Sequence, residues 1–160
     1  MNTESGRPLR LSIAGILFSL LLMPNVASAI NCQIRLNPII FGTYMPLTPV
    51  HLDVIGSITI RCMAAPGNYA VTIGPGLGGN QLARTLSAGG GNILNYNLYR
   101  DAARSQIWGN GTPPTFTVTG TRPSRGRPTV TDHSIYGRVF SNQAPNPGTY
   151  TDNLLVTVLF

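Results

Sequence analysis

Short runs of alternating apolar and polar residues, separated by glycine and proline, follow one another from residue 30 to the end of the chain. Val, Ile, Thr, Tyr and Phe are frequent in these runs and favour strands, whereas Gly and Pro mark turns. Helical periodicity is hard to find in this region. The pattern predicts an all-β domain, and the spacing is typical of a β-sandwich. We expect strands at residues 32–41, 52–62, 69–73, 93–99, 116–119, 134–140 and 150–160.

The alternation is clearest in the last predicted strand. Alternate side chains of a strand point to opposite faces of the sheet, so one face of this segment should belong to the core. The other face carries Thr151, Asn153, Leu155, Thr157 and Leu159. The predicted core face is made of Tyr150, Leu154, Val156, Val158 and Phe160, interrupted only by Asp152.

The first 29 residues have a different character. Arg7 and Arg10 precede a mostly apolar run at residues 11–23, and small residues follow at 27–29. This order is that of a secretory signal peptide, and the run is shorter than the roughly 20 residues of a membrane-spanning helix. We predict a signal peptide over residues 1–29, cleaved after Ala29. One exported domain over residues 30–160 would remain, which is long enough to bury a core.

Cys32 and Cys62 are the two cysteines of the chain. In an exported protein such a pair is most simply interpreted as one disulfide. Cys62 shares a predicted strand face with Ile58 and Ile60, so it should point inward. The chain has no Cys-x-x-Cys pair and its two histidines lie far apart in sequence, so we predict neither a metal site nor a cofactor.

The net charge of the whole chain is +6. A basic protein can bind nucleic acid, anionic lipid or acidic polysaccharide, but export removes intracellular nucleic acid from these partners. The densest cationic cluster is formed by Arg122, Arg125 and Arg127, in a loop punctuated by proline. These side chains could bind sulfate, phosphate or uronate through bidentate contacts. The sequence favours the alternative of a solvated loop that keeps the protein soluble.

Two sequence patterns resemble catalytic motifs without their usual context. Residues 74–79 match G-x-G-x-x-G, but no apolar helix follows, as a dinucleotide site would require, so we expect a hairpin turn. Asp132, His133 and Ser134 are the residue types of a hydrolase triad, but adjacent strand side chains diverge. We expect a turn there that leads into a strand at Ile135. The predicted mature chain has no Glu and four scattered Asp residues, so we predict a protein that is not an enzyme.

The sequence YNLYRDAAR at residues 96–104, followed by Trp108 and Gly109, resembles the spore coat protein U domain family. This family includes subunits of archaic chaperone–usher pili of the Csu type. The cysteine pair, FGTY at residues 41–44, YGR at 136–138 and the closing GTYTDNLLVTVLF at 148–160 also resemble the family. The resemblance extends over essentially the whole predicted mature chain.

The resemblance implies an incomplete immunoglobulin-like β-sandwich that lacks one strand and leaves its core open as a groove. A periplasmic chaperone is expected to lend a strand first, and a neighbouring pilus subunit to replace it during assembly at an outer-membrane usher. The subunit would then reach the cell surface in a fibre. By this resemblance, Leu154, Val156, Val158 and Phe160 would line the groove.

One feature departs from the shaft subunits of such pili, which carry a donor extension ahead of the first cysteine. Cleavage after Ala29 would leave only Ile30 and Asn31 before Cys32. Our hypothesis is that the subunit accepts a strand without donating one, which suits a tip or minor subunit. Adhesion to an abiotic or glycan surface, and a role in biofilm formation, follow from that position by analogy.

Candidate surface contacts are Tyr44, Tyr99, Trp108 and the cluster from Arg122 to Arg127. For the three aromatic residues, packing in the core is the favoured alternative. Two other functions remain open: a secreted coat or matrix protein with the same fold, and a lectin-like carbohydrate-binding domain. A pilus subunit should be unstable alone and bind a chaperone, whereas a coat protein should fold by itself.

Overall fold

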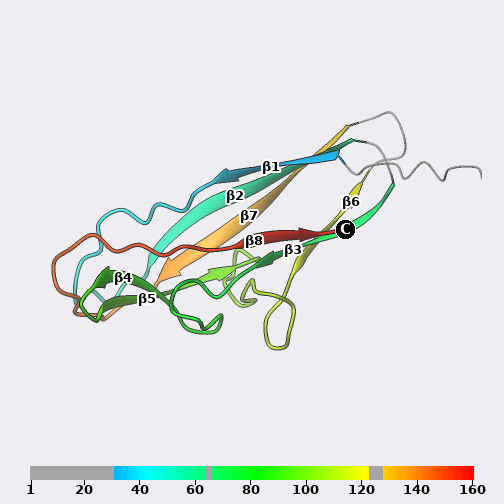
Figure 1. Ribbon diagram of the computed structural model, residues 1–160. Coiled ribbons are helices and arrows are strands. Elements are labelled where there is room, and N and C mark those ends of the chain that lie inside the picture. The colour runs from blue at the N-terminus through cyan, green and yellow to red at the C-terminus, as the bar shows by residue number, and fades with distance from the viewer. Residues whose placement is uncertain (1–30, 64–65, 123–127) are drawn as a thin grey trace, which may run out of the picture.

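The computed structural model describes residues 31–63, 66–122 and 128–160, which form strands joined by loops (Figure 1). The predicted signal peptide therefore lies outside the described residues. No helix in the described ranges is long and apolar enough to cross a membrane. The strands are β1 (Asn31–Asn37), β2 (Leu52–Met63), β3 (Gly67–Ile73), β4 (Arg84–Gly89), β5 (Asn92–Tyr99), β6 (Val118–Arg122), β7 (Thr129–Val139) and β8 (Val156–Leu159).

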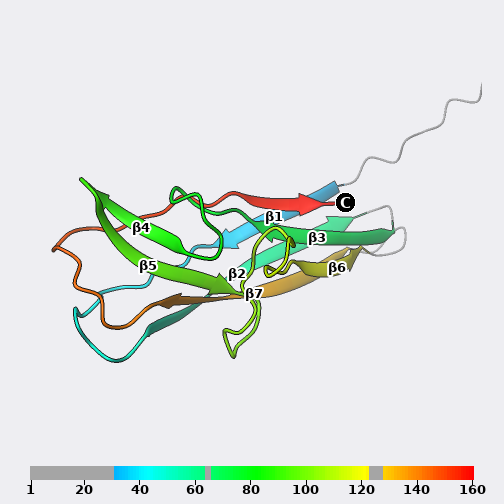
Figure 2. The same cartoon turned by 90° about the horizontal axis from the view of Figure 1, so that it is seen from below.

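These strands form two sheets with antiparallel pairing. One sheet has the order β1-β2-β7-β5-β4, and the other has the order β6-β3-β8. In Figure 1 β1, β2 and β7 form the upper layer, β8, β3 and β6 lie below them, and β4 and β5 curl around at one end. Seen from below, β1 and β8 lie along one long side of the molecule and β6 and β7 along the other (Figure 2). The predicted all-β sandwich is confirmed.

The core lies between the inner faces of the sheets. Ile58 and Ile60 of β2 oppose Val71 and Ile73 of β3, and all four side chains are buried. Trp108, in the connection between β5 and β6, completes this core with no exposed surface. The alternation expected in β2 is therefore the one observed, with Ile58, Ile60 and Cys62 pointing inward.

Several strand boundaries differ from the predicted ones. At these positions backbone hydrogen bonding, and not the side-chain pattern, determines where the strand begins or ends. β1 ends at Asn37 because Pro38 has no N–H and restricts the residue before it. β4 was not predicted at all. β6 was expected at residues 116–119 but spans Val118–Arg122. β7 begins at Thr129, five residues before the predicted start.

Candidate functional site: an open groove between the sheets

Two strand edges on the same side of the sandwich lack neighbours. Among the described residues, β1 pairs with β2 alone and β8 pairs with β3 alone. Figure 2 shows both strands along one long side of the molecule. An edge strand presents unpaired N–H and C=O groups, which are a template for pairing with another strand.

The inward-facing residues of β1 are exposed on this side. Ile34 is paired with Ile60, and Leu36 with Ile58, so each member of a pair points to the same face. The two β2 residues are 1% and 0% exposed, whereas Ile34 is 45% and Leu36 is 57% exposed. The inner face of this sheet is therefore covered over β2 and open over β1.

β8 shows the same asymmetry on the opposite layer. Val156 is paired with Ile73 and Val158 with Val71, which again places each pair on one face. Both β3 residues are buried, but both valines of β8 are only half-buried. The inner surfaces of β1 and β8 thus flank a groove that neither sheet closes.

A cavity of about 850 Å³ occupies the deeper part of this groove. Its lining is mainly apolar and includes Leu36, Ile39, Phe41, Tyr96, Leu154 and Val156. Val158 faces inward on β8 but does not line the cavity. Phe160 is 53% exposed, and the Arg122 guanidinium carbon lies 5.3 Å from the centre of its ring.

The C-terminal segment is anchored at the groove by Asp152. Its carboxylate accepts a hydrogen bond of 2.5 Å from the Tyr96 hydroxyl and one of 2.7 Å from the backbone N–H of Leu77. Burial raises the pKa of the Tyr96 phenol, so it stays protonated and donates. Asp152 thereby ties this segment to β5 and to the loop after β3.

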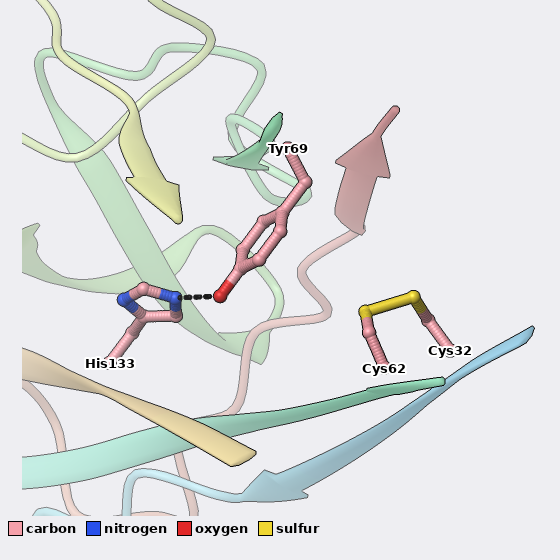
Figure 3. The surroundings of a disulfide bond; sticks show 4 residues. All are labelled: Cys32, Cys62, Tyr69 and His133. Atoms are coloured by element: carbon pink, nitrogen blue, oxygen red, sulfur yellow. Dashed lines mark hydrogen bonds between the residues drawn. A yellow bond between two sulfur atoms is a disulfide. The ribbon is translucent and has the colours of Figure 1, made fainter. Parts of the chain in front are cut away.

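The disulfide fixes the other edge of the groove. Cys32 of β1 is bonded to Cys62 of β2, directly across the strand pair (Figure 3). Nearby, the Tyr69 hydroxyl of β3 lies 2.9 Å from Nε2 of His133 in β7. Burial lowers the pKa of His133, and the Asp132 carboxylate opposes this effect. The edge strand β1 is therefore held by a covalent bond next to a polar contact that joins the two sheets.

The sequence profile of the Spore Coat Protein U domain matches residues 18–157. The chain belongs to the spore coat protein U domain family. Protein U of Myxococcus xanthus is 30% identical over 133 residues, which cover 75% of this chain and 70% of that protein.

A solved structure shares the fold of this spore coat protein U domain. It is the crystal structure of the CsuC–CsuE chaperone–tip adhesion subunit pre-assembly complex from archaic chaperone–usher Csu pili of Acinetobacter baumannii. One of its chains superposes with a TM-score of 0.57 at 22% identity, covering 82% of this chain. The match spans 40% of that longer chain.

The three aromatic candidates of this spore coat protein U domain pack in or against the interior, which is the alternative that the sequence favoured. Trp108 is 0% exposed, and its indole N–H donates to the Val71 carbonyl at 2.9 Å, so it is a core residue and not a surface contact. Tyr99 is likewise buried, and Tyr44 is half-buried against Gln143. Arg122 is half-buried, while Arg125 and Arg127 lie outside the described residues.

The residues Asp132, His133 and Ser134 lie inside β7 and not in a turn, so that expectation was wrong. The inward alternation of β7 extends to His133, and Asp132 points to the outer face, where it accepts a hydrogen bond from Thr59 of β2. No triad geometry results, since the strand directs adjacent side chains apart. The glycines at residues 74–79 form a loop between β3 and β4.

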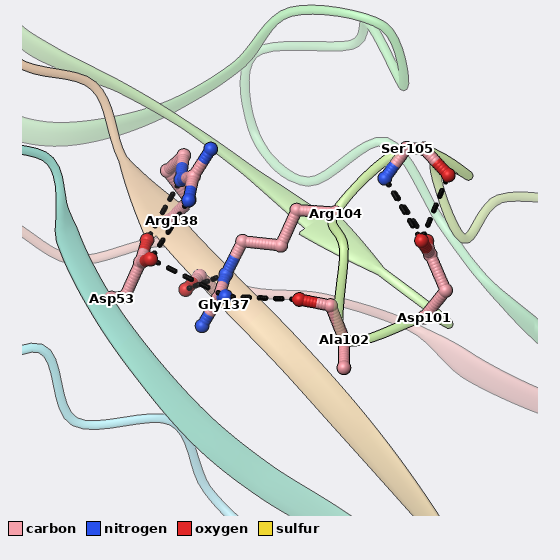
Figure 4. Close-up of polar contacts among 7 residues, drawn as sticks. All are labelled: Asp53, Asp101, Ala102, Arg104, Ser105, Gly137 and Arg138. Carbon is pink, nitrogen blue, oxygen red and sulfur yellow. Dashed lines mark hydrogen bonds and ion pairs between the residues drawn. The ribbon is translucent and has the colours of Figure 1, made fainter.

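The other aspartates are engaged in separate structural contacts. Asp53 accepts two hydrogen bonds from Arg138, at 2.7 and 2.8 Å, and lies 3.3 Å from Arg104 (Figure 4). The Arg138 hydrogen bond is the main cause that lowers the pKa of Asp53. Asp101 caps the turn at Ser105 with a hydrogen bond of 2.8 Å. No group of three or more His, Cys, Asp or Glu in the described ranges could hold a metal ion.

An ordered apolar loop between β1 and β2 was missed by sequence reasoning. Met45, Leu47 and Val50 are 70%, 69% and 67% exposed. The loop is nevertheless held in place, since the Leu47 N–H donates to the Gln143 carbonyl at 3.0 Å and the Asn142 N–H to Thr48 at 2.9 Å. The sequence signal that could have indicated this loop is a set of apolar residues that lie between prolines and do not alternate with polar residues. The loop lies at the end of the molecule opposite the C-terminus (Figure 1).

Proposed function

We propose that this chain is a structural, non-enzymatic subunit of a chaperone–usher surface pilus, and that its groove takes a strand from another protein. The observation that carries the proposal is the pair of open edges. Ile34 and Leu36 on β1, and Val156 and Val158 on β8, face the interior without being covered. Family membership and the fold shared with a chain of the Csu complex support it.

A strand in the groove would satisfy both physical needs of this site. Its backbone would pair with an open edge, as in β-strand addition, and its alternate side chains would enter the apolar cavity. Fully burying one Val, Leu or Ile side chain contributes roughly 1.5–3 kcal/mol. An incoming strand that covered the half-buried residues along the groove would therefore stabilise the fold substantially. A periplasmic chaperone would supply the first strand, and a neighbouring subunit would replace it at the usher.

Co-expression tests this proposal against the alternative of a coat protein with the same fold. The chain is produced in a periplasm with and without a candidate chaperone and usher of the Csu type. We expect a one-to-one complex with the chaperone, and degradation or aggregation without it. A stable monomer, equally abundant in both cases, would instead favour the self-sufficient coat protein.

We further propose that the subunit stands at the fibre end and contributes to adhesion. The ordered loop with Met45, Leu47 and Val50 supports a contact with an apolar surface, because large exposed apolar side chains held in one place are typical of interaction sites. Cleavage after Ala29 would leave no donor strand. N-terminal sequencing of the exported protein tests the position, and a start well upstream of Ile30 would exclude it.

The adhesive loop has its own test, which uses intact fibres. Replacing Met45 and Leu47 with Ser should reduce retention on polystyrene, because the apolar contact is lost. Ile55, on the outer face of β2, is 64% exposed. The matched change Ile55→Ser removes this side chain and should leave retention unchanged. Equal retention of all three fibres would reject the adhesive role of the loop.

A further inference from the structure

Arg122 stands apart among the described residues because two of its buried nitrogen atoms lack a hydrogen-bond partner. The residue as a whole is half-buried, but its Nε and Nη1 atoms are shielded from water and find no acceptor in that part of the chain. Buried polar groups are nearly always paired in native structures, and an unpaired buried cation is costly. The packing of this chain alone does not explain the arrangement.

The Arg122 side chain lies on the inner face of β6. Gly120, two residues earlier, packs against the ring of the buried Tyr69, so this set of alternate positions faces the interior. The guanidinium passes over Gly67 of β3, where a Cβ would collide with Nη2. It reaches Phe160 at the end of β8, where β6, β3 and the C-terminus come together (Figure 1).

Other arginines that lie over aromatic rings also have conventional partners. Arg100 donates to a backbone carbonyl at 2.7 Å, and Arg104 lies 3.3 Å from the carboxylate of Asp53. For Arg122, the contact within the described residues is the ring of Phe160, with the guanidinium carbon 5.3 Å from its centre. An aromatic face attracts a cation, but it does not replace acceptors for two N–H groups.

The chain offers no acidic side chain to Arg122. Residues 31–160 contain no Glu and four Asp residues, and each of the four accepts a hydrogen bond from another group. They are Asp53, Asp101, Asp132 and Asp152. Ion pairs in the described ranges join Asp53 to Arg104 and Arg138 alone. The adjacent sequence at 123–127 adds arginines and no acid. A side-chain carboxylate for Arg122 therefore comes from another molecule.

We infer that Arg122 binds an acidic side chain on the strand that enters the groove, at the position of that strand beside Phe160. The inference rests on the proposed function. Phe160 continues the alternation of Val156 and Val158, which face the groove. A strand paired with β8 places one of its side chains roughly 4.5–5.5 Å from its neighbour on β8. A carboxylate there would accept charge-assisted hydrogen bonds from the guanidinium.

This contact would fix the register of the incoming strand. Alternate apolar side chains repeat every two residues, so apolar pockets alone tolerate a shift of the strand by two positions. A single acidic side chain, matched to Arg122 at one end of the groove, removes that ambiguity. A strand that carries an apolar or cationic residue at this position leaves the guanidinium unpaired and is disfavoured.

Competition by synthetic peptides tests the inference on the protein bound to the partner with which it purifies. The host peptide has about ten residues, alternates Val and Ser, and has blocked ends, so that it carries no carboxylate of its own. Glu or Gln replaces each Val in turn. At one position alone, we expect the Glu peptide to displace the partner at a concentration at least about tenfold lower than the Gln peptide does.

Two neutral variants of the protein should lose this preference. Arg122→Met keeps the apolar stem, and Arg122→Gln keeps a polar end, so the second variant serves if the first does not fold. The matched control is Arg61→Met, which removes the same charge from an exposed position of β2. It should retain the preference for Glu. Circular dichroism of each complex confirms folding.

Equal displacement by Glu and Gln peptides at every position would overturn the inference, as would a preference for Glu that survives in both Arg122 variants. In those cases displacement by the host peptide would still support a groove that accepts a strand. If no peptide displaces the partner, the proposed function fails together with the inference.

Discussion

Arg84 illustrates how single polar side chains hold this sandwich together. It is 0% exposed, and its guanidinium reaches the ends of three separate segments. It donates to the Gly74 carbonyl at 2.8 Å, to the Trp108 carbonyl at 2.8 Å and to Asn97 Oδ1 at 2.6 Å. Burial lowers the pKa of Arg84. The hydrogen bonds to its several acceptors replace those that the guanidinium would make to water.

Substituting Arg84 with Lys should destabilise the fold strongly. An ammonium group cannot reproduce the planar fork that reaches all of these acceptors. We expect a loss of about 2–4 kcal/mol in the free energy of unfolding, measured by denaturant titration. The matched change Arg61→Lys, at an exposed position of β2, should alter it by less than about 0.5 kcal/mol. Similar values for both variants would contradict the structural role of Arg84.

His133 makes stability depend on pH near neutrality. Because its pKa is lowered in the folded state, chiefly by burial, the unfolded chain binds a proton there more readily. The contribution of His133 is therefore fully present above the unfolded pKa of roughly 6.5 and is lost as the pH falls through the lower folded value. The pKa values of Asp53 and Asp101 are also lowered, and their contributions to stability are lost only below about pH 5.

Unfolding of the wild type and of His133→Gln isolates this effect. Gln cannot titrate but can still hydrogen-bond the Tyr69 hydroxyl. Between about pH 7.5 and about pH 5.5 the wild type should lose stability while the variant changes little. The same pH dependence in both proteins would assign the effect to other groups.

At the level of strands, side-chain patterns predicted faces better than they predicted pairing. The alternation of β2 and β7 follows burial, so their core faces could be read from the sequence. β4 could not be predicted from the sequence, because Arg84, Ser87 and Gly89 do not form a strand pattern. The segment is a strand because it pairs with β5. The predicted strand at residues 150–160 is divided, since Thr151 bridges Ser87 of one sheet before Val156 joins β3 of the other.

The groove flank on β8 offers a direct test with adjacent residues. Val156 faces the cavity, whereas Leu155 is 74% exposed on the other side of the chain. Val156→Asp should reduce co-purification of the strand-donating partner at least about tenfold, because the charge would be buried by the incoming strand. Leu155→Asp should leave the complex intact. Parallel loss in both variants would indicate general misfolding instead.

Removal of the disulfide should release the β1 edge. Cys32 and Cys62 close a loop of sequence separation 30, and the lost cross-link should cost roughly 3–4 kcal/mol. The double variant Cys32→Ser with Cys62→Ser is expected to bind its chaperone poorly, since β1 forms one flank of the groove. Unfolding and co-purification are measured together. Unchanged binding despite lower stability would show that β1 is not needed as a flank.

For the molecule as a whole, the decisive feature is an interior that is closed on one side and open on the other. Alternation in a sequence shows which residues point inward, but it does not show whether anything covers them. Leu154, Val156 and Val158 could therefore be placed on a core face from the alternation, whereas an open groove was expected from the family resemblance alone. Its position between β1 and β8 required the structure. The exposed Phe160, stacked on Arg122, could not be anticipated because that contact joins β6 to the end of the chain.

The central claim is that another chain completes this sandwich. A crystal structure of the exported protein with whatever co-purifies with it tests the claim most directly. We predict an extended segment of the partner between β1 and β8, hydrogen-bonded to the free edge of β8, with alternate apolar side chains reaching the cavity lined by Leu36 and Val156. A protein that purifies as a stable monomer, with the edge of β8 unpaired and the groove empty, would contradict it.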